Sequence, residues 1–149
     1  MADTTAQKQA ELWVVQNYLP RLFGGLAFEE REVKLIWGGY FAFDAVSLDS
    51  SVVGLVSTSL PITCRGKQAT AKFQKLKADC LYLMHVALPC RKLMAFTEES
   101  MKVHFEKERL RGRFPPEIEL IHAPLPHEIS EKVLVARAAA SKEVTPSVT

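Results

Sequence analysis

The sequence predicts an α/β domain with a central mixed sheet of five strands flanked by helices, because its apolar residues change period along the chain. Residues 30–60 contain three short segments rich in β-branched and aromatic residues, separated by turn residues, whereas later segments alternate between helical and strand periods. The chain has 149 residues, 48% of them hydrophobic, which is enough for one core. We therefore expect one domain over residues 1–126, followed over residues 127–149 by a short helix and a disordered tail.

The first half of the chain predicts a helix and a three-stranded meander. Residues 6–23 have good helix formers and apolar residues at helical spacing, with Pro20 expected to end or kink the last turn. The next two strands, over residues 30–37 and 40–48, are joined by a hairpin at Gly38-Gly39. A second turn at residues 49–51 leads into the third strand.

The second half predicts two helices that alternate with two strands. Residues 67–87 place one apolar stripe at a period of 3.6, and residues 92–97 form a short strand. Thr97 is a candidate N-cap for a charged helix that ends near Arg113, and residues 117–123 form the last strand. Right-handed crossovers would make the last strands parallel. The predicted order is α-β-β-β-α-β-α-β.

The composition favours a cytoplasmic protein without a membrane segment. No apolar run approaches the roughly 20 residues that span a bilayer, and the N-terminal residues are polar. Cys64, Cys80 and Cys90 are an odd number without paired spacing, which indicates free thiols. Cys80 and His85 are five residues apart on one predicted helix, so a zinc site with Cys90 is not favoured.

Positive charge is concentrated in the middle of the chain. Residues 65–113 contain 12 Lys and Arg against 5 Asp and Glu, whereas the segments on both sides have more acids than bases. Such a surplus is a candidate surface for phosphate contacts, although salt bridges within a solvated helix would use the same residues. The candidate nucleic-acid-binding residues are Lys67, Lys72, Lys75, Arg109 and Arg111.

Two acids stand out as candidate site residues. Asp44 interrupts the apolar strand FAFDAVS, where an unpaired buried carboxylate is costly, and Glu11 lies in the first helix. A solvated position near a sheet edge would also explain Asp44, and complementation of the helix dipole would explain Glu11.

The order of elements over residues 6–125 resembles the PD-(D/E)xK nuclease superfamily, the fold of many restriction endonucleases. The resemblance implies that Asp44 matches the Asp at the end of the family's second strand and that Glu11 matches a helix Glu of some members. The family's third strand has Glu-x-Lys, and its carboxylates hold Mg²⁺ for phosphodiester cleavage. Leu55 and Ser57 occupy the expected Glu and Lys positions and supply neither a carboxylate nor an amine, which predicts the loss of ordinary catalysis.

Three functions remain open. The first is a catalytically inactive restriction endonuclease-like protein that binds DNA, RNA or a partner that handles nucleic acid. The second is a Mg²⁺-dependent nuclease with a relocated site of Asp44, Glu11 and Lys72, in which Asp44 is the metal ligand. The third is a non-enzymatic assembly or interaction module. No cofactor is expected except Mg²⁺ in the second case, and a homodimer is an open alternative.

Overall fold

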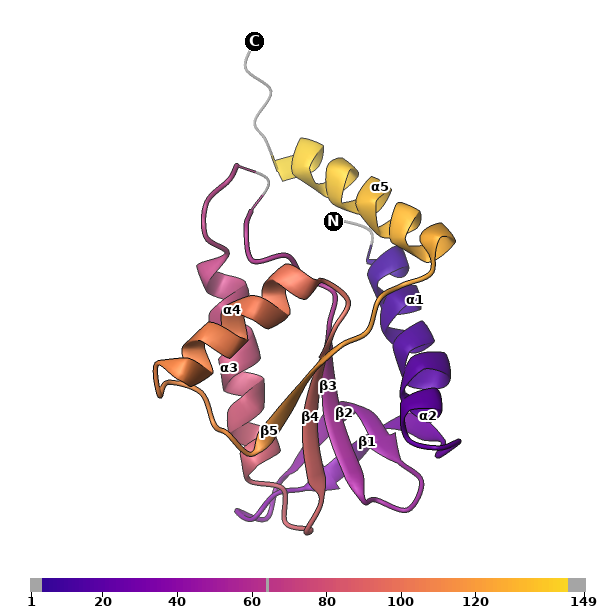
Figure 1. Cartoon of the computed structure of the whole chain (residues 1–149), viewed down its shortest axis with the longest axis vertical. Helices are drawn as coiled ribbons and strands as arrows, with labels where there is room; N and C mark the ends of the chain where they lie inside the picture. The colour runs from indigo at the N-terminus through magenta and orange to yellow at the C-terminus, as the bar shows by residue number, and fades with distance from the viewer. Residues whose placement is uncertain (1–3, 64, 145–149) are drawn as a thin grey trace.

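The computed structural model describes residues 4–63 and 65–144, which include one mixed sheet of five strands (Figure 1). The strands follow the chain in the order β1-β2-β3-β4-β5. The first three are antiparallel, and β3, β4 and β5 are parallel to one another, as the right-handed crossovers predicted. Their bounds are Phe28–Lys34, Tyr40–Ser47, Val52–Ser57, Arg91–Phe96 and Ile118–His122.

Helices cover both faces of the sheet. The N-terminal helix lies on one face and α3 and α4 lie on the other, while α5 packs across α1 (Figure 1). The predicted order of elements is only partly confirmed, because the first helix has three parts and a long helix follows β5. That last helix ends at Val144, and the remaining residues of the predicted disordered tail lie outside the described residues. The helices are α1 (Thr5–Trp13), the π-helical segment η1 (Val14–Tyr18), α2 (Leu19–Leu22), α3 (Thr70–Met84), α4 (Glu99–Leu110) and α5 (His127–Val144).

The N-terminal helix continues through Pro20 to Leu22, although this proline was expected to end or kink it. Proline has no amide proton and its ring clashes with the carbonyl four residues earlier in an α-helix. The wider π-helical turn, in which the Leu19 amide donates to the Val14 carbonyl, comes directly before Pro20. We attribute the continuation of the helix to this local widening.

The sheet separates two apolar cores. On the α3 and α4 side, Phe43 and Leu55 pack with Phe73 and Phe105. On the N-terminal helix side, Ala45 and Val56 pack with residues that include Val14, Val15 and Leu93. Alternate residues of β3 therefore face different helices, which decides the orientation of every candidate site residue on that strand.

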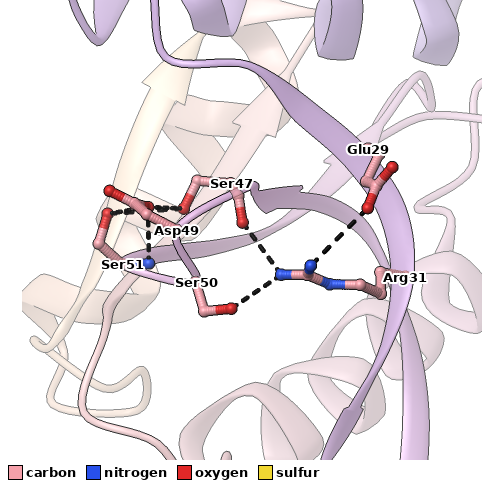
Figure 2. Close-up of polar contacts among 6 residues, drawn as sticks. All are labelled: Glu29, Arg31, Ser47, Asp49, Ser50 and Ser51. Carbon is pink, nitrogen blue, oxygen red and sulfur yellow. Dashed lines mark hydrogen bonds and ion pairs between the residues drawn. The ribbon is translucent and has the colours of Figure 1, made fainter.

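The turn between β2 and β3 is fixed by a polar network (Figure 2). Asp49 Oδ1 accepts hydrogen bonds from the Ser51 amide and hydroxyl and from the Ser47 hydroxyl. These hydrogen bonds, the Ser51 hydroxyl foremost, lower the pKa of Asp49 to about 2. Arg31 donates to the Ser47 carbonyl and to Ser50, whose φ of 61° is unusual for a residue other than glycine.

Both hairpin turns lie where the sequence predicted them, but the N-cap of α4 is not the residue that the sequence predicted. Gly38 has a φ of 98° in the turn between β1 and β2, a conformation that glycine adopts without steric cost. The N-cap residue of α4 is Glu98 rather than Thr97, because Thr97 still bonds to Ser57 as an extension of the parallel ladder. None of the helices in the described part of the chain is long and apolar enough to cross a membrane.

Candidate functional site

A β-bulge in β2 positions Asp44. Glu29 of β1 pairs with Val46 and Arg31 pairs with Phe43, so two residues of β2, Asp44 and Ala45, stand opposite one residue of β1. A bulge of this kind turns side chains away from strict alternation. Asp44 and Ala45 both lie toward the N-terminal helix, Ala45 in its apolar core and Asp44 in the wall of a pocket.

The Asp44 carboxylate also takes part in the sheet. β2 and β3 pair through Ala45 with Gly54 and Val46 with Val53. Beyond that point the Val56 amide donates to Asp44 Oδ2 at 2.8 Å. The side chain thus supplies the acceptor that a continued ladder would have supplied, which gives Asp44 a structural role.

Glu11 of α1 and Asp44 line one pocket of about 590 Å³ between the N-terminal helix and the first two strands. Leu12 and Val15 of the helix and Phe28 of β1 form part of its apolar wall, and Glu29 and Glu30 add two further acids. The structure therefore brings together the two acids that the sequence singled out.

The pKa values of both acids are raised. Burial is the largest cause for Glu11, the charge of Asp44 adds to it, and the pKa of Glu11 reaches about 7. Burial also raises the pKa of Asp44, while the Val56 amide opposes the shift. A carboxyl group that titrates near neutral pH beside a second carboxyl group is a feature of many functional sites.

Lys72 is exposed on α3 and does not line this pocket. The lysine whose charge lowers the pKa of both Glu11 and Asp44 is Lys75, which is paired with Asp79 at 3.4 Å. Lys75 is exposed, as expected of a candidate surface cation, but its pairing with Asp79 was not predicted. The spacing of Lys75 and Asp79, i and i+4 on a predicted helix, is a signal that could have identified the pair.

Leu55 and Ser57 do not share a face of the sheet with Asp44, although the resemblance requires the third-strand motif to do so. Leu55 is 3% exposed in the core under α3 and α4, and Ser57 follows it on the same face by alternation. Asp44 lies toward the opposite face, where β3 presents Gly54 and Val56 instead. Neither Gly54 nor Val56 offers a carboxylate or an amine.

A Mg²⁺ site does not fit the residues around Asp44. One Asp44 oxygen is already used by the Val56 amide, and Mg²⁺ prefers several convergent oxygen ligands. Over the described ranges, no three His, Cys, Asp or Glu side chains are grouped so that they could hold a metal ion. Cys80 and Cys90 are free thiols, as the sequence indicated, and Cys64 lies outside the described residues.

The five candidate nucleic-acid-binding residues differ in their surroundings. Arg109 donates to the Ile118 carbonyl at 3.0 Å and so connects α4 to β5, and Lys75 is paired with Asp79. Lys67, Lys72 and Arg111 are exposed, and none of them has an ion pair with another described residue. These three therefore remain available to a phosphate group.

Comparison of the chain with protein-family models, with curated proteins and with solved structures finds no match.

Proposed function

We propose that this protein is a catalytically inactive, restriction endonuclease-like protein that binds nucleic acid through the layer of α3, α4 and the segments that adjoin them. The observation that carries the proposal is that Lys67, Lys72 and Arg111 are exposed and have no acidic partner among the described residues. They lie in the segment where the sequence has its positive surplus. Unpaired surface cations attract phosphates through release of condensed counterions.

The pocket of Glu11 and Asp44 supports the part of this proposal that calls the protein catalytically inactive. Its position, between the first helix and the second strand, corresponds to the place that the resemblance assigns to the nuclease carboxylates. It lacks the third-strand carboxylate and lysine, and Glu11 is partly neutral near pH 7. Such a pocket would bind Mg²⁺ poorly, because the catalytic role of this ion needs several convergent anionic oxygen ligands.

Fluorescence polarisation with a labelled 20-nucleotide DNA and an RNA of the same sequence tests the proposal. The affinity should fall steeply as salt rises from 50 to 200 mM and should depend little on sequence, because phosphate contacts carry it. The triple variant Lys67→Ala, Lys72→Ala and Arg111→Ala should weaken binding about tenfold or more and should reduce the slope of log Kd against log salt.

A matched triple variant removes the same charge elsewhere. Arg21, Lys34 and Lys132 are exposed and lie on α2, β1 and α5, outside the proposed layer. Their replacement by Ala should leave most of the affinity intact. Absence of binding at 50 mM salt would reject the proposal in favour of an interaction module. Cleavage of either probe with Mg²⁺ or Mn²⁺ would show that the protein is not catalytically inactive.

A further inference from the structure

An apolar surface lies at the end of the sheet where α3 ends and the β1–β2 hairpin turns. The Ile36 amide donates to the His85 carbonyl at 2.9 Å, and Leu35 forms a bridge with Val86, so the hairpin and the end of α3 are held together. The hairpin side chains Ile36 and Trp37 are each 60% exposed. Contiguous exposed apolar side chains of this size are typical of binding surfaces.

This surface continues into a pocket through His85. Its ring stacks on Trp37 with centroids 4.5 Å apart, and its Nδ1 lies 2.6 Å from the Leu81 carbonyl, so the ring is held from two sides. His85 and Leu81 also line a pocket of about 350 Å³ between the end of α3 and the segment after α4. The pocket and the Trp37 surface thus form one continuous feature, which we call the hairpin-end surface.

The pocket is apolar inside and positive at its rim. Met84 and Phe114 contribute to its wall with Cys80, whose burial raises the pKa of its thiol to about 12 and keeps it neutral. Lys77 and Arg113 supply the rim. An apolar pocket with a few charged groups at its edge is the usual form of a site that selects a ligand by charge.

The rim keeps a positive charge after its internal pairing. Lys77 and Arg113 both contact Glu108, at 3.8 Å and 2.7 Å, so two cations share one carboxylate. Arg111, exposed and without an ion pair among the described residues, is close in sequence to Arg113. The surface therefore complements a negatively charged ligand.

We propose that the hairpin-end surface binds an acidic peptide segment of a partner protein, with one apolar side chain of the peptide inserted into the pocket beside Leu81 and Met84. A small molecule would be confined to the pocket, whereas the exposed apolar surface extends over the His85–Trp37 stack to Ile36. A second copy of this chain in a contact whose two-fold axis passes through the pocket would place the positive rim against itself, which is unfavourable. Tryptophan, methionine and arginine are also among the residues enriched in protein interfaces.

Fluorescence anisotropy of labelled peptides tests this proposal on the full chain. The probes are Glu-Asp-Phe-Glu-Leu-Glu and Glu-Asp-Leu-Glu-Leu-Glu, each with a counterpart in which every acidic residue is lysine. At least one acidic probe should bind tenfold or more tightly than its lysine counterpart, and added salt should weaken it. No saturable binding of either acidic probe up to about 1 mM, or equal binding of the lysine probes, would overturn the proposal.

Paired variants locate the binding. Leu81→Ser and Leu134→Ser change leucines of similar exposure, 51% and 57%, the second on α5, so both variants should remain folded. Leu81→Ser should weaken the acidic probe about tenfold or more, and Leu134→Ser should have no effect. Equal effects of the two variants would overturn the assigned location, and loss of a stable dimer in Leu81→Ser would show that a second copy is the occupant instead.

A second pair tests the charge. Lys77→Met removes a rim cation and keeps the aliphatic stem, and Lys132→Met makes the same change on α5. Lys77→Met should weaken the acidic probe and reduce its salt dependence, whereas Lys132→Met should not. An unchanged salt dependence in Lys77→Met would overturn the role of the rim.

Discussion

The carboxylate of Asp44 accepts a hydrogen bond from the backbone amide of Val56, at 2.8 Å, where the β2–β3 ladder has ended. This bond competes with the unfavourable burial of the carboxylate, since burial raises the pKa of Asp44. Asp44→Asn keeps an acceptor and removes the charge, whereas Asp44→Ala leaves the amide without a partner. We expect Asp44→Ala to be less stable than Asp44→Asn by about 1–3 kcal/mol in urea unfolding at pH 8.

The comparison of these two variants isolates the hydrogen bond because both remove the carboxylate charge. Asp44→Asn should be at least as stable as the wild type at pH 8, because it removes a charge whose burial is unfavourable and keeps the acceptor. Equal stability of the Ala and Asn variants would mean that water satisfies the Val56 amide and that the bond has no structural role.

Glu11 should make the stability of the protein depend on pH. Its pKa rises from 4.5 to about 7 on folding, so its protonated form is favoured in the folded state. The contribution to stability is therefore complete below about pH 4.5 and is lost as the pH rises through 7. Relative to the wild type, Glu11→Gln should gain in Tm between pH 5 and pH 7 and keep that gain at pH 8.

Circular dichroism melting at several pH values measures this change, and Glu32→Gln, at an exposed position of β1, is the matched control. The control should show the same difference from the wild type at every pH. Because the charge of Asp44 is the second cause of the Glu11 shift, the pKa of Glu11 measured by NMR should fall in Asp44→Asn. An unchanged value would show that the two acids are not coupled.

The elements of the fold could be predicted because the period of the apolar residues is a local signal. Phe73, Leu76, Cys80 and Leu83 are all buried on one side of α3, as the spacing predicted. The meander and both of its turns were predicted from β-branched runs and turn residues. The long α5 was underestimated, because its packing against α1 is a tertiary contact that a weakly apolar sequence does not reveal.

The candidate site was predicted less well, because its geometry depends on irregular features. Glu11 and Asp44 do share a pocket, but the bulge at Asp44 changes which residues of β3 share its face. Leu55 and Ser57 were assigned from the resemblance to the nuclease superfamily, which requires the third-strand motif to share a face with Asp44. A one-residue bulge reverses the face of the sheet to which each later side chain of the strand points, and no residue in FAFDAVS signals the bulge.

Substitution of Gly54 tests whether this residue faces the N-terminal helix side of the sheet, beside Leu93. A Cβ atom at position 54 would lie 2.5 Å from Leu93 Cδ1 and 3.3 Å from the Leu93 carbonyl oxygen. Because Leu93 is fully buried, the added methyl group has little room, and Gly54→Ala should cost about 1–3 kcal/mol in urea unfolding. Gly39→Ala, where nothing lies within 4 Å of the new atom and φ is not positive, should change stability by about 0.5 kcal/mol or less.

The double variant Leu55→Glu and Ser57→Lys tests whether the third strand is a degraded Glu-x-Lys strand. In the structure both side chains are buried, and they face α3 and α4, away from the pocket of Glu11 and Asp44. The new carboxylate would therefore enter an apolar core instead of joining Asp44. The variant should lose several kcal/mol of stability or fail to fold, because an unpaired buried charge has no compensating partner.

A surface double variant separates this effect from the chemistry of the new residues. Ser130→Lys with Leu134→Glu makes the same residue changes on α5, where Leu134 is 57% exposed, and should change stability by about 0.5 kcal/mol or less. Calorimetric titration of the double variant with Mn²⁺ completes the test. If the double variant does not fold, the single variant Ser57→Lys is titrated in its place. Neither core variant should bind Mn²⁺ more tightly than the wild type, since neither places an oxygen ligand beside Asp44. A folded double variant that gains Mn²⁺ affinity, and loses that gain when Asp44→Asn is added, would show that the original alignment of Leu55 and Ser57 was right and that the facing described above is wrong.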